Sequence, residues 1–86
     1  FEGVPQSEIS QADFQNGIDI INLLANKTNF LKSNGEARRA LSENSISVNK
    51  TKVNEKYIIG GQDLIDEQYI LLQRGKKNYF IVKVVP

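Results

Sequence analysis

Residues 33–49 read SNGEARRALSENSISVN, and along them a helical spacing of apolar residues gives way to a strand-like one. This segment opens with a capping box, because the Ser33 hydroxyl can accept from the amide of Glu36 while the Glu36 carboxylate reaches back to the amide of Ser33. Apolar residues at 37, 40 and 41 then form one stripe of a helix. The sequence therefore predicts a helix that begins at Ser33 and ends near Asn44.

The second half of this segment has the period of a strand. Ile46 and Val48 are separated by a serine, which predicts a short, half-buried strand. Asn49 and Lys50 after it indicate a turn, but a two-residue hairpin turn needs positive φ at both positions, which a lysine disfavours. We therefore expect a longer or differently shaped turn at this point.

The rest of the chain adds one helix and further strands. Helical spacing predicts a first helix from about Ile18 to Ala25. Apolar runs bounded by turn residues predict strands at residues 57–59, 69–74 and 78–85. Gly75-Lys76-Lys77 joins the last two strands as a hairpin loop, with a glycine available for positive φ.

These elements suggest one small domain with a short lead-in. Residues 1–16 are polar, carry Gly and Pro near their start, and are expected to be a linker with a short strand or turn. Residues 17–86 are expected to form the domain. Its class is α+β, with two short helices packed on a small, largely antiparallel sheet.

The composition fits a folded domain and excludes several kinds of site. Leu, Ile, Val and Phe make up about 31% of the residues, well above the ~20% below which disorder is expected. The chain has no cysteine and no histidine, which excludes disulfides, thiolate metal sites and the commonest catalytic base. No apolar run approaches the ~18 residues of a membrane helix, so a cytoplasmic location is expected.

The charged residues are segregated along the chain. The net charge is only +1, but residues 27–56 and 74–86 are basic, whereas residues 1–26 and 57–73 are acidic. Two basic blocks indicate a positive face suited to a phosphate backbone. Ordinary solvation of the surface would give a similar pattern, so charge alone does not decide between the two.

Two motifs carry a resemblance to known families. Glu36-Ala37-Arg38-Arg39 followed by Ile46-Ser47-Val48-Asn49 resembles, in residue type and spacing, the RNA-binding motif of ribosomal protein S-four and its relatives. The string Arg74-Gly75-Lys76-Lys77-Asn78-Tyr79 is similar to the closing hairpin of bacterial-type tyrosyl-tRNA synthetases, and residues 1–5 resemble the linker before it. The chain departs from the family pattern at three places. Asn34 stands where the family often has Lys or Arg, and Lys32 could supply the phosphate contact that Asn34 lacks. Asn44-Ser45 and Lys50 stand where the family usually has glycines.

The resemblance implies an S-four-like, tRNA-binding C-terminal domain of a tyrosine–tRNA ligase. Its partner would be the tyrosine tRNA, held at the variable arm and anticodon stem. ATP would serve the parent enzyme, a homodimer, while the fragment itself is compatible with a monomer and carries no cofactor. No membrane contact, metal or catalytic residue is expected, since the family's His-Ile-Gly-His and Lys-Met-Ser-Lys-Ser signatures are absent from this chain.

The chemistry of the basic residues agrees with such a role. Guanidinium groups bind phosphate in a bidentate manner and stack on bases, and free amides at a helix N-terminus favour anions. The expected RNA-binding residues are Lys32, Ser33, Arg38, Arg39, Asn49, Lys50, Lys52, Lys76 and Lys77.

Other interpretations stay open. A stand-alone S-four-like module that binds ribosomal or other structured RNA would share the Glu-Ala-Arg-Arg core without needing the closing hairpin, and a protein–protein module would ignore RNA. Arg39 could pair with Glu36 on the helix surface instead of contacting RNA. The tyrosines at 57, 69 and 79 are more typical of half-buried strand residues than of base-stacking ones.

Overall fold

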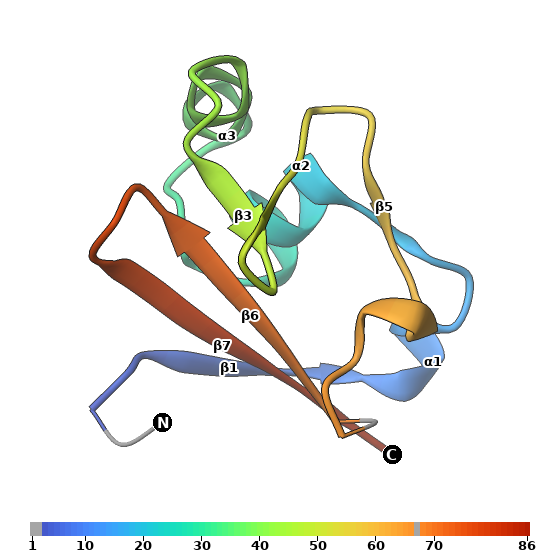
Figure 1. Ribbon diagram of the computed structural model, residues 1–86. Helices are drawn as coiled ribbons and strands as arrows, with labels where there is room; N and C mark the ends of the chain where they lie inside the picture. The colour runs from blue at the N-terminus through green and yellow to red at the C-terminus, as the bar shows by residue number, and fades with distance from the viewer. Residues whose placement is uncertain (1–2, 67) are drawn as a thin grey trace.

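The computed structural model describes residues 3–66 and 68–86, so Phe1, Glu2 and Glu67 lie outside the described residues, including the start of the expected linker. Figure 1 shows the arrangement of the elements. They are β1 (Gln6–Ser10), α1 (Gln11–Phe14), β2 (Ile18–Asp19), α2 (Ile20–Asn22), the π-helical turn η1 (Leu23–Lys27), α3 (Asn34–Ser42), β3 (Ile46–Val48), β4 (Thr51–Lys52), β5 (Ile58–Ile59), the 3-10 turn η2 (Gly61–Asp63), β6 (Tyr69–Arg74) and β7 (Asn78–Val85). None of the helices in these ranges has the length and hydropathy of a membrane-spanning segment.

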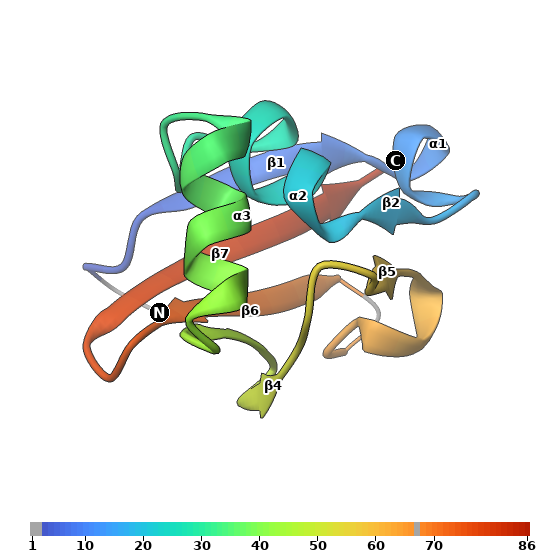
Figure 2. The ribbon, with the colours of Figure 1, turned by 90° about the horizontal axis from the view of Figure 1, so that it is seen from above.

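The main sheet has five strands in the order β1-β7-β6-β3-β4. Its neighbours are antiparallel except for β1 and β7, which run parallel, and β2 pairs with β5 in a separate two-stranded sheet. Figure 2 shows α2 and α3 lying over the same face of the main sheet. The predicted α+β class with a largely antiparallel sheet is thus confirmed.

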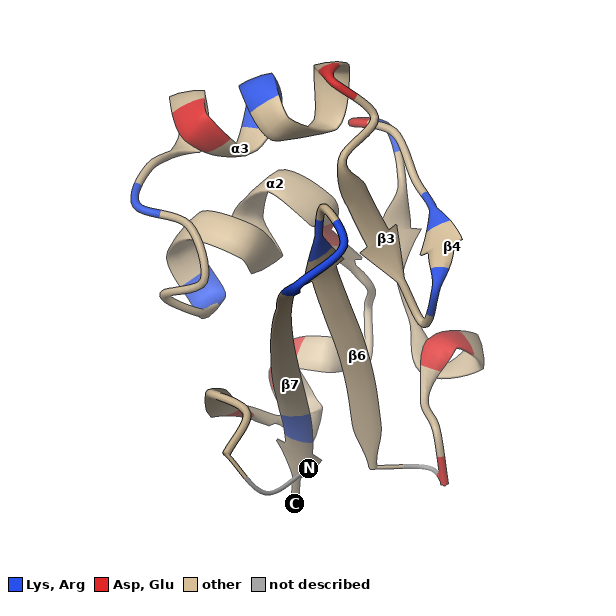
Figure 3. Cartoon of the chain, turned by 60° about the vertical axis from the view of Figure 1, so that its left-hand side comes forward, with Lys and Arg blue, Asp and Glu red and all other residues tan. Residues whose placement is uncertain are grey.

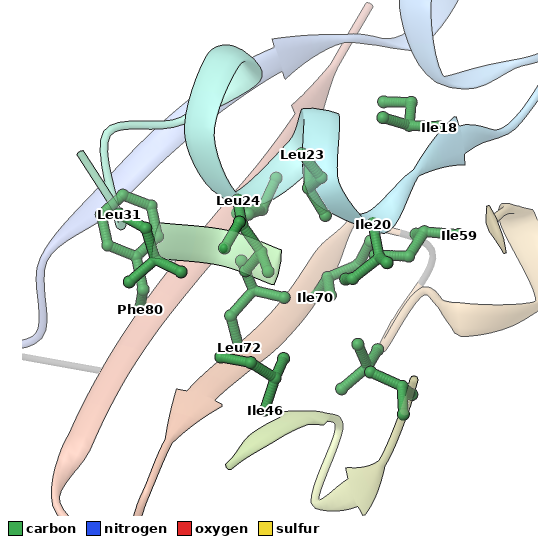
Figure 4. Close-up of a cluster of buried hydrophobic side chains, with 14 of the residues drawn as sticks. Ile18, Ile20, Leu23, Leu24, Leu31, Ile46, Ile59, Ile70, Leu72 and Phe80 are labelled. Carbon is green, nitrogen blue, oxygen red and sulfur yellow. The ribbon is translucent and has the colours of Figure 1, made fainter. Parts of the chain in front are cut away.

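The core lies between that sheet face and the helices. Alternate residues of β6 and β7 point toward it, including Ile70, Leu72 and Phe80, because side chains alternate between the two faces of a strand. Leu23 and Leu24 meet them from η1, as Figure 4 shows. The β6–β7 hairpin has the predicted bounds, since an uninterrupted apolar run on each side and a glycine at the tip leave few other pairings.

Helix α3 begins after Ser33 and ends near Asn44 as predicted, but one of the two bonds of the predicted capping box was wrong. The Ser33 hydroxyl accepts from the amide of Glu36 at 3.1 Å, but the Glu36 carboxylate accepts from the amide of Lys32, at 3.2 Å, and not from that of Ser33. At the other end, Asn44 adopts a left-handed φ of 58°. The amide of Ser45 donates to the carbonyl of Ala40 at 3.1 Å, which closes a Schellman-type cap.

The first predicted helix is shifted along the chain. Residues 18 and 19 form β2, which pairs with β5, and the helix begins at Ile20 with Asp19 accepting from the amide of Asn22 at 3.2 Å. It continues to Lys27 as η1 and ends where the buried Thr28 hydroxyl donates to the Leu23 carbonyl at 2.8 Å. The predicted start at Ile18 was wrong because pairing with a distant strand overrides the local spacing.

The prediction of a longer or differently shaped turn after β3 was also wrong. Val48 pairs directly with Thr51, so the connection has two residues, Asn49 and Lys50, with φ values of 51° and 72°. Asparagine tolerates this conformation, whereas lysine pays about 1–2 kcal/mol for it. The Asn49 side chain anchors the turn, since its Oδ1 accepts from the amide of Leu71 at 2.9 Å and its Nδ2 donates to the carbonyl of Asp63.

The described part of the lead-in belongs to the sheet and the core. The short strand expected there is β1, an edge strand that pairs with β7 in the register Gln6 to Ile81. Ile9 and Phe14 are 4% and 3% exposed and belong to the core cluster. Residues 6–14 therefore belong to the main sheet and to the core that it shares with the helices.

Candidate nucleic-acid interface

Three basic segments gather at one end of the molecule. Figure 3 shows basic residues on α3, on the tip of the β6–β7 hairpin and on β4. Lys83 lies elsewhere on β7, because it pairs with Tyr69 at the end of the hairpin that is away from its tip. β3 holds these segments together, because it follows α3 and pairs with β4 on one side and β6 on the other. The amide of Gly75 donates to the carbonyl of Ser45 at 2.8 Å and fixes the hairpin tip beside the end of α3.

Arg38 and Arg39 are exposed on α3. Neither has a carboxylate of the described residues within 4.0 Å. Glu36 is paired instead with Arg74, with an N–O distance of 2.7 Å, so the alternative Glu36–Arg39 pair does not form. The ion pair between α3 and β6 thus leaves both α3 guanidinium groups open to a ligand.

The N-terminus of α3 is occupied by its own side chains. Ser33 caps it, and hydrogen bonds from Arg74 and from the amide of Lys32 lower the pKa of the Glu36 carboxyl. A carboxylate at this position opposes a phosphate at the helix amides. Ser33 is therefore placed as a cap, and Lys32 beside it is exposed.

Lys50 and Lys52 are exposed at the β3–β4 turn and on β4. Asn49 differs from them, because it is half-buried and both polar atoms of its amide are engaged by backbone groups of Leu71 and Asp63. Of the three residues of this turn and strand that were expected to bind RNA, only the two lysines are exposed to solvent. Asn49 positions the turn that carries them.

Lys76 and Lys77 are exposed at the tip of the hairpin. The loop has three residues, in which Gly75 has a φ of 68° and its carbonyl accepts from the Gln73 side chain at 2.9 Å. A glycine at this position avoids the Cβ clash of a left-handed conformation. The loop is thereby held in a shape that projects two adjacent ammonium groups beside α3.

A groove of about 530 Å³ lies between this tip and the loop that precedes α3. Lys32 and Lys77 line it, together with Asn29, Phe30 and Tyr79. The sequence did not indicate the last three as site residues. Each wall has an asparagine followed by an aromatic residue, Asn29-Phe30 in one and Asn78-Tyr79 in the other. This local pattern could indicate a binding site only once the fold had brought the two segments together.

Tyr57 has a structural partner. Its hydroxyl donates to the Asp63 carboxylate, and this bond, with burial, raises the pKa of Tyr57 to about 12. The other Asp63 oxygen accepts from the amide of Gly60 at 3.0 Å. Because the Asp63 carbonyl also accepts from the Asn49 side chain, this cluster is connected to the β3–β4 turn.

Comparison with known proteins relates the whole chain to one family. Residues 1–82 match the model of the tyrosine–tRNA ligase SYY-like C-terminal domain. The chain is 59% identical over 85 residues to a tyrosine–tRNA ligase of Flavobacterium johnsoniae, covering 99% of this chain and 20% of that protein. It is 58% identical over 84 residues to that of Flavobacterium psychrophilum (98% and 20% covered) and 36% over 85 residues to that of Porphyromonas gingivalis (98% and 20%). The chain thus spans about a fifth of the length of these curated relatives. It belongs to the family of tyrosine–tRNA ligase SYY-like C-terminal domains.

Proposed function

We propose that this domain binds the tyrosine tRNA and orients it for aminoacylation by the catalytic part of a tyrosine–tRNA ligase. The observation that carries the proposal is the gathering of exposed cations from α3, the β3–β4 turn and the hairpin tip at one end of the molecule. None of these cations has a carboxylate of the described residues within 4.0 Å. Family membership supports tRNA as the polyanion. We expect the contacts to fall on the variable arm and the anticodon stem.

The physics of such a contact is electrostatic and shape-based. Phosphate contacts position a protein on a nucleic acid but carry little sequence information. An A-form RNA arm presents phosphates on both sides of a wide minor groove, which suits cations spread over three separate segments. Arg38 and Arg39 on a rigid helix, with Lys50, Lys52, Lys76 and Lys77 on two tight turns, would fix the register of the arm.

In this proposal, the rest of the parent enzyme carries out the aminoacylation reaction. ATP and tyrosine would be bound there, in a cytoplasmic ligase that we expect to be a homodimer. The domain supplies binding energy and orientation, which raise the effective concentration of the tRNA acceptor end at a distant active site.

Single arginine variants test this function. Arg38→Ala and Arg39→Ala should each weaken binding of tyrosine tRNA about tenfold, because each removes a charge-assisted contact of about 1.5 kcal/mol. The matched control is Lys83→Ala, which removes the same charge about 17 Å along β7 from the hairpin end. Fluorescence titration measures the affinities.

Equal losses for all three variants would contradict the proposed face. Binding of a ribosomal RNA helix as tight as that of tyrosine tRNA would favour a general S-four-like RNA-binding module instead. Lack of any RNA binding at low salt would favour a protein partner.

A further inference from the structure

The groove beside the hairpin exists because the pairing of β1 with β7 ends early. The amide of Ile81 donates to the carbonyl of Pro5 at 2.9 Å, and the strand register begins at Gln6. Proline has no N–H and cannot continue the ladder. In the described residues, no strand pairs with this edge of β7 before Ile81. Residues 3–5 line the groove without forming a strand, and the loop containing Asn29 to Lys32 lines it as well.

The edge of β7 presents polar backbone groups to the groove. Ile81 directs its amide toward the β1 side, and Tyr79, two residues earlier, directs its N–H and C=O to the same side. A donor next to an acceptor is the pattern that matches the edge of a nucleobase, since each base offers an adjacent donor and acceptor. Asn78, which is exposed and also lines the groove, carries a side-chain amide that offers a further donor and acceptor.

The opposite wall supplies an aromatic surface. The Phe30 ring is half-buried and is held against Phe80, with ring centroids 5.3 Å apart. The main chain at Phe30 is also held, because its amide donates to the Thr28 hydroxyl at 3.3 Å. A ring fixed in this way loses little entropy when a base stacks on it, and stacking on aromatic side chains is how proteins bind unpaired RNA bases.

The charge of the groove suits one phosphate. Among its described lining residues, Arg74 and Glu36 neutralise each other in an ion pair whose side chains are 31% and 27% exposed. Lys32 and Lys77 have no carboxylate of the described residues within 4.0 Å and stand on opposite walls. The volume of about 530 Å³ lies within the range of roughly 300–1,000 Å³ typical of small-ligand sites.

We propose that this groove receives one unstacked nucleotide of the bound tRNA, with the base against Phe30 and the β7 edge and the phosphate between Lys32 and Lys77. The inference rests on the tRNA-binding function proposed above and deepens it. A paired base within a helix could not enter, so the occupant is a nucleotide from a loop, a bulge or the junction of an arm. The groove would distinguish an RNA with such a nucleotide from a continuous duplex.

The test combines a protein variant with a change in the RNA. In tyrosine tRNA, each unpaired nucleotide outside the acceptor end is replaced in turn by an abasic one, and binding to this domain is measured by titration. One position should weaken binding at least fivefold. Phe30→Leu, which keeps an apolar side chain against Phe80, should weaken binding of the intact tRNA by a similar factor and cause no further loss with that abasic tRNA.

The control variant is Phe14→Leu, the same change at a buried position away from the groove, which should leave tRNA binding unaltered. Binding that is indifferent to every abasic position, or losses that add fully in Phe30→Leu, would overturn the nucleotide site. The salt-dependent binding of intact tRNA would then remain, so the proposed function would survive. A domain that binds no tRNA at all would remove both.

Discussion

Lys50 occupies the most unfavourable backbone position among the exposed cations. Its φ of 72° places a side chain where glycine is usually found, in the second position of a two-residue hairpin turn. The hydrogen bonds of Asn49 to Leu71 and Asp63 hold the turn in this shape. Backbone strain of this kind persists where the surrounding structure holds it and is often found at functional sites, and here the strained residue carries an exposed ammonium.

Lys50→Gly should therefore stabilise the domain and weaken its function. The free energy of unfolding should rise by about 1 kcal/mol as the left-handed strain is relieved, while tRNA affinity falls severalfold. Urea denaturation and tRNA titration measure the two effects. Asn44→Gly is the matched control, since it also places glycine at a left-handed position (φ 58°) but removes no charge and should leave affinity unchanged. A Lys50→Gly domain that binds tRNA as tightly as the original would show that the strain serves no binding role.

Glu36 should make stability depend on pH in the acid range. Hydrogen bonds from Arg74 and from the Lys32 amide lower its pKa below 4.5. A carboxyl whose pKa is lower in the folded than in the unfolded state stabilises the fold above the unfolded pKa, and this contribution is lost as the pH falls through the folded pKa. Glu36→Gln should thus reduce stability at neutral pH and flatten its decline below about pH 4.5. An identical decline in both proteins would contradict the role given to this ion pair.

At the scale of elements, β3 and its turn connect the parts of the basic face. The sequence predicted the elements where local signals agree with the fold, as in the β6–β7 hairpin and in α3 with its Ser33 cap. It failed at the β3–β4 turn, because Asn49 is anchored by Asp63 and Leu71, 14 and 22 residues further along. It also misplaced the start of α2, since β2 forms only by pairing with β5.

Asn49→Ala should loosen this connection. It leaves the Leu71 amide and the Asp63 carbonyl without their partner and should cost about 1–3 kcal/mol in the free energy of unfolding. It should also weaken tRNA binding, because Lys50 and Lys52 lose their fixed position. Asn54→Ala provides a control in which only the local bond to the amide of Lys56, at 2.9 Å, is removed. Denaturation curves that coincide for the two variants would refute the anchoring role.

For the molecule as a whole, side chains from the covered face of the sheet form part of the core, and the exposed cations of α3, the β3–β4 turn and the hairpin tip lie at one end. The sequence identified the basic residues of that end, because charge and motif spacing are readable along the chain. It could not reveal the groove or the Glu36–Arg74 pair, whose members lie 38 residues apart and meet only through the β3–β6 pairing. The pairing engages Glu36 away from Arg39, so that within residues 3–66 and 68–86 no carboxylate lies within 4.0 Å of either α3 arginine.

The dependence of tRNA affinity on salt tests this account most directly. The logarithm of the association constant should fall linearly with the logarithm of salt concentration, with a slope of about −0.7 to −0.9 for each phosphate contacted. Removing Arg38 and Arg39 together should reduce the magnitude of the slope by about 1.5, while Lys83→Ala leaves it unchanged. A slope near zero in the unaltered domain, or one that Arg38→Ala with Arg39→Ala does not change, would show that this end of the molecule is not where the tRNA backbone binds.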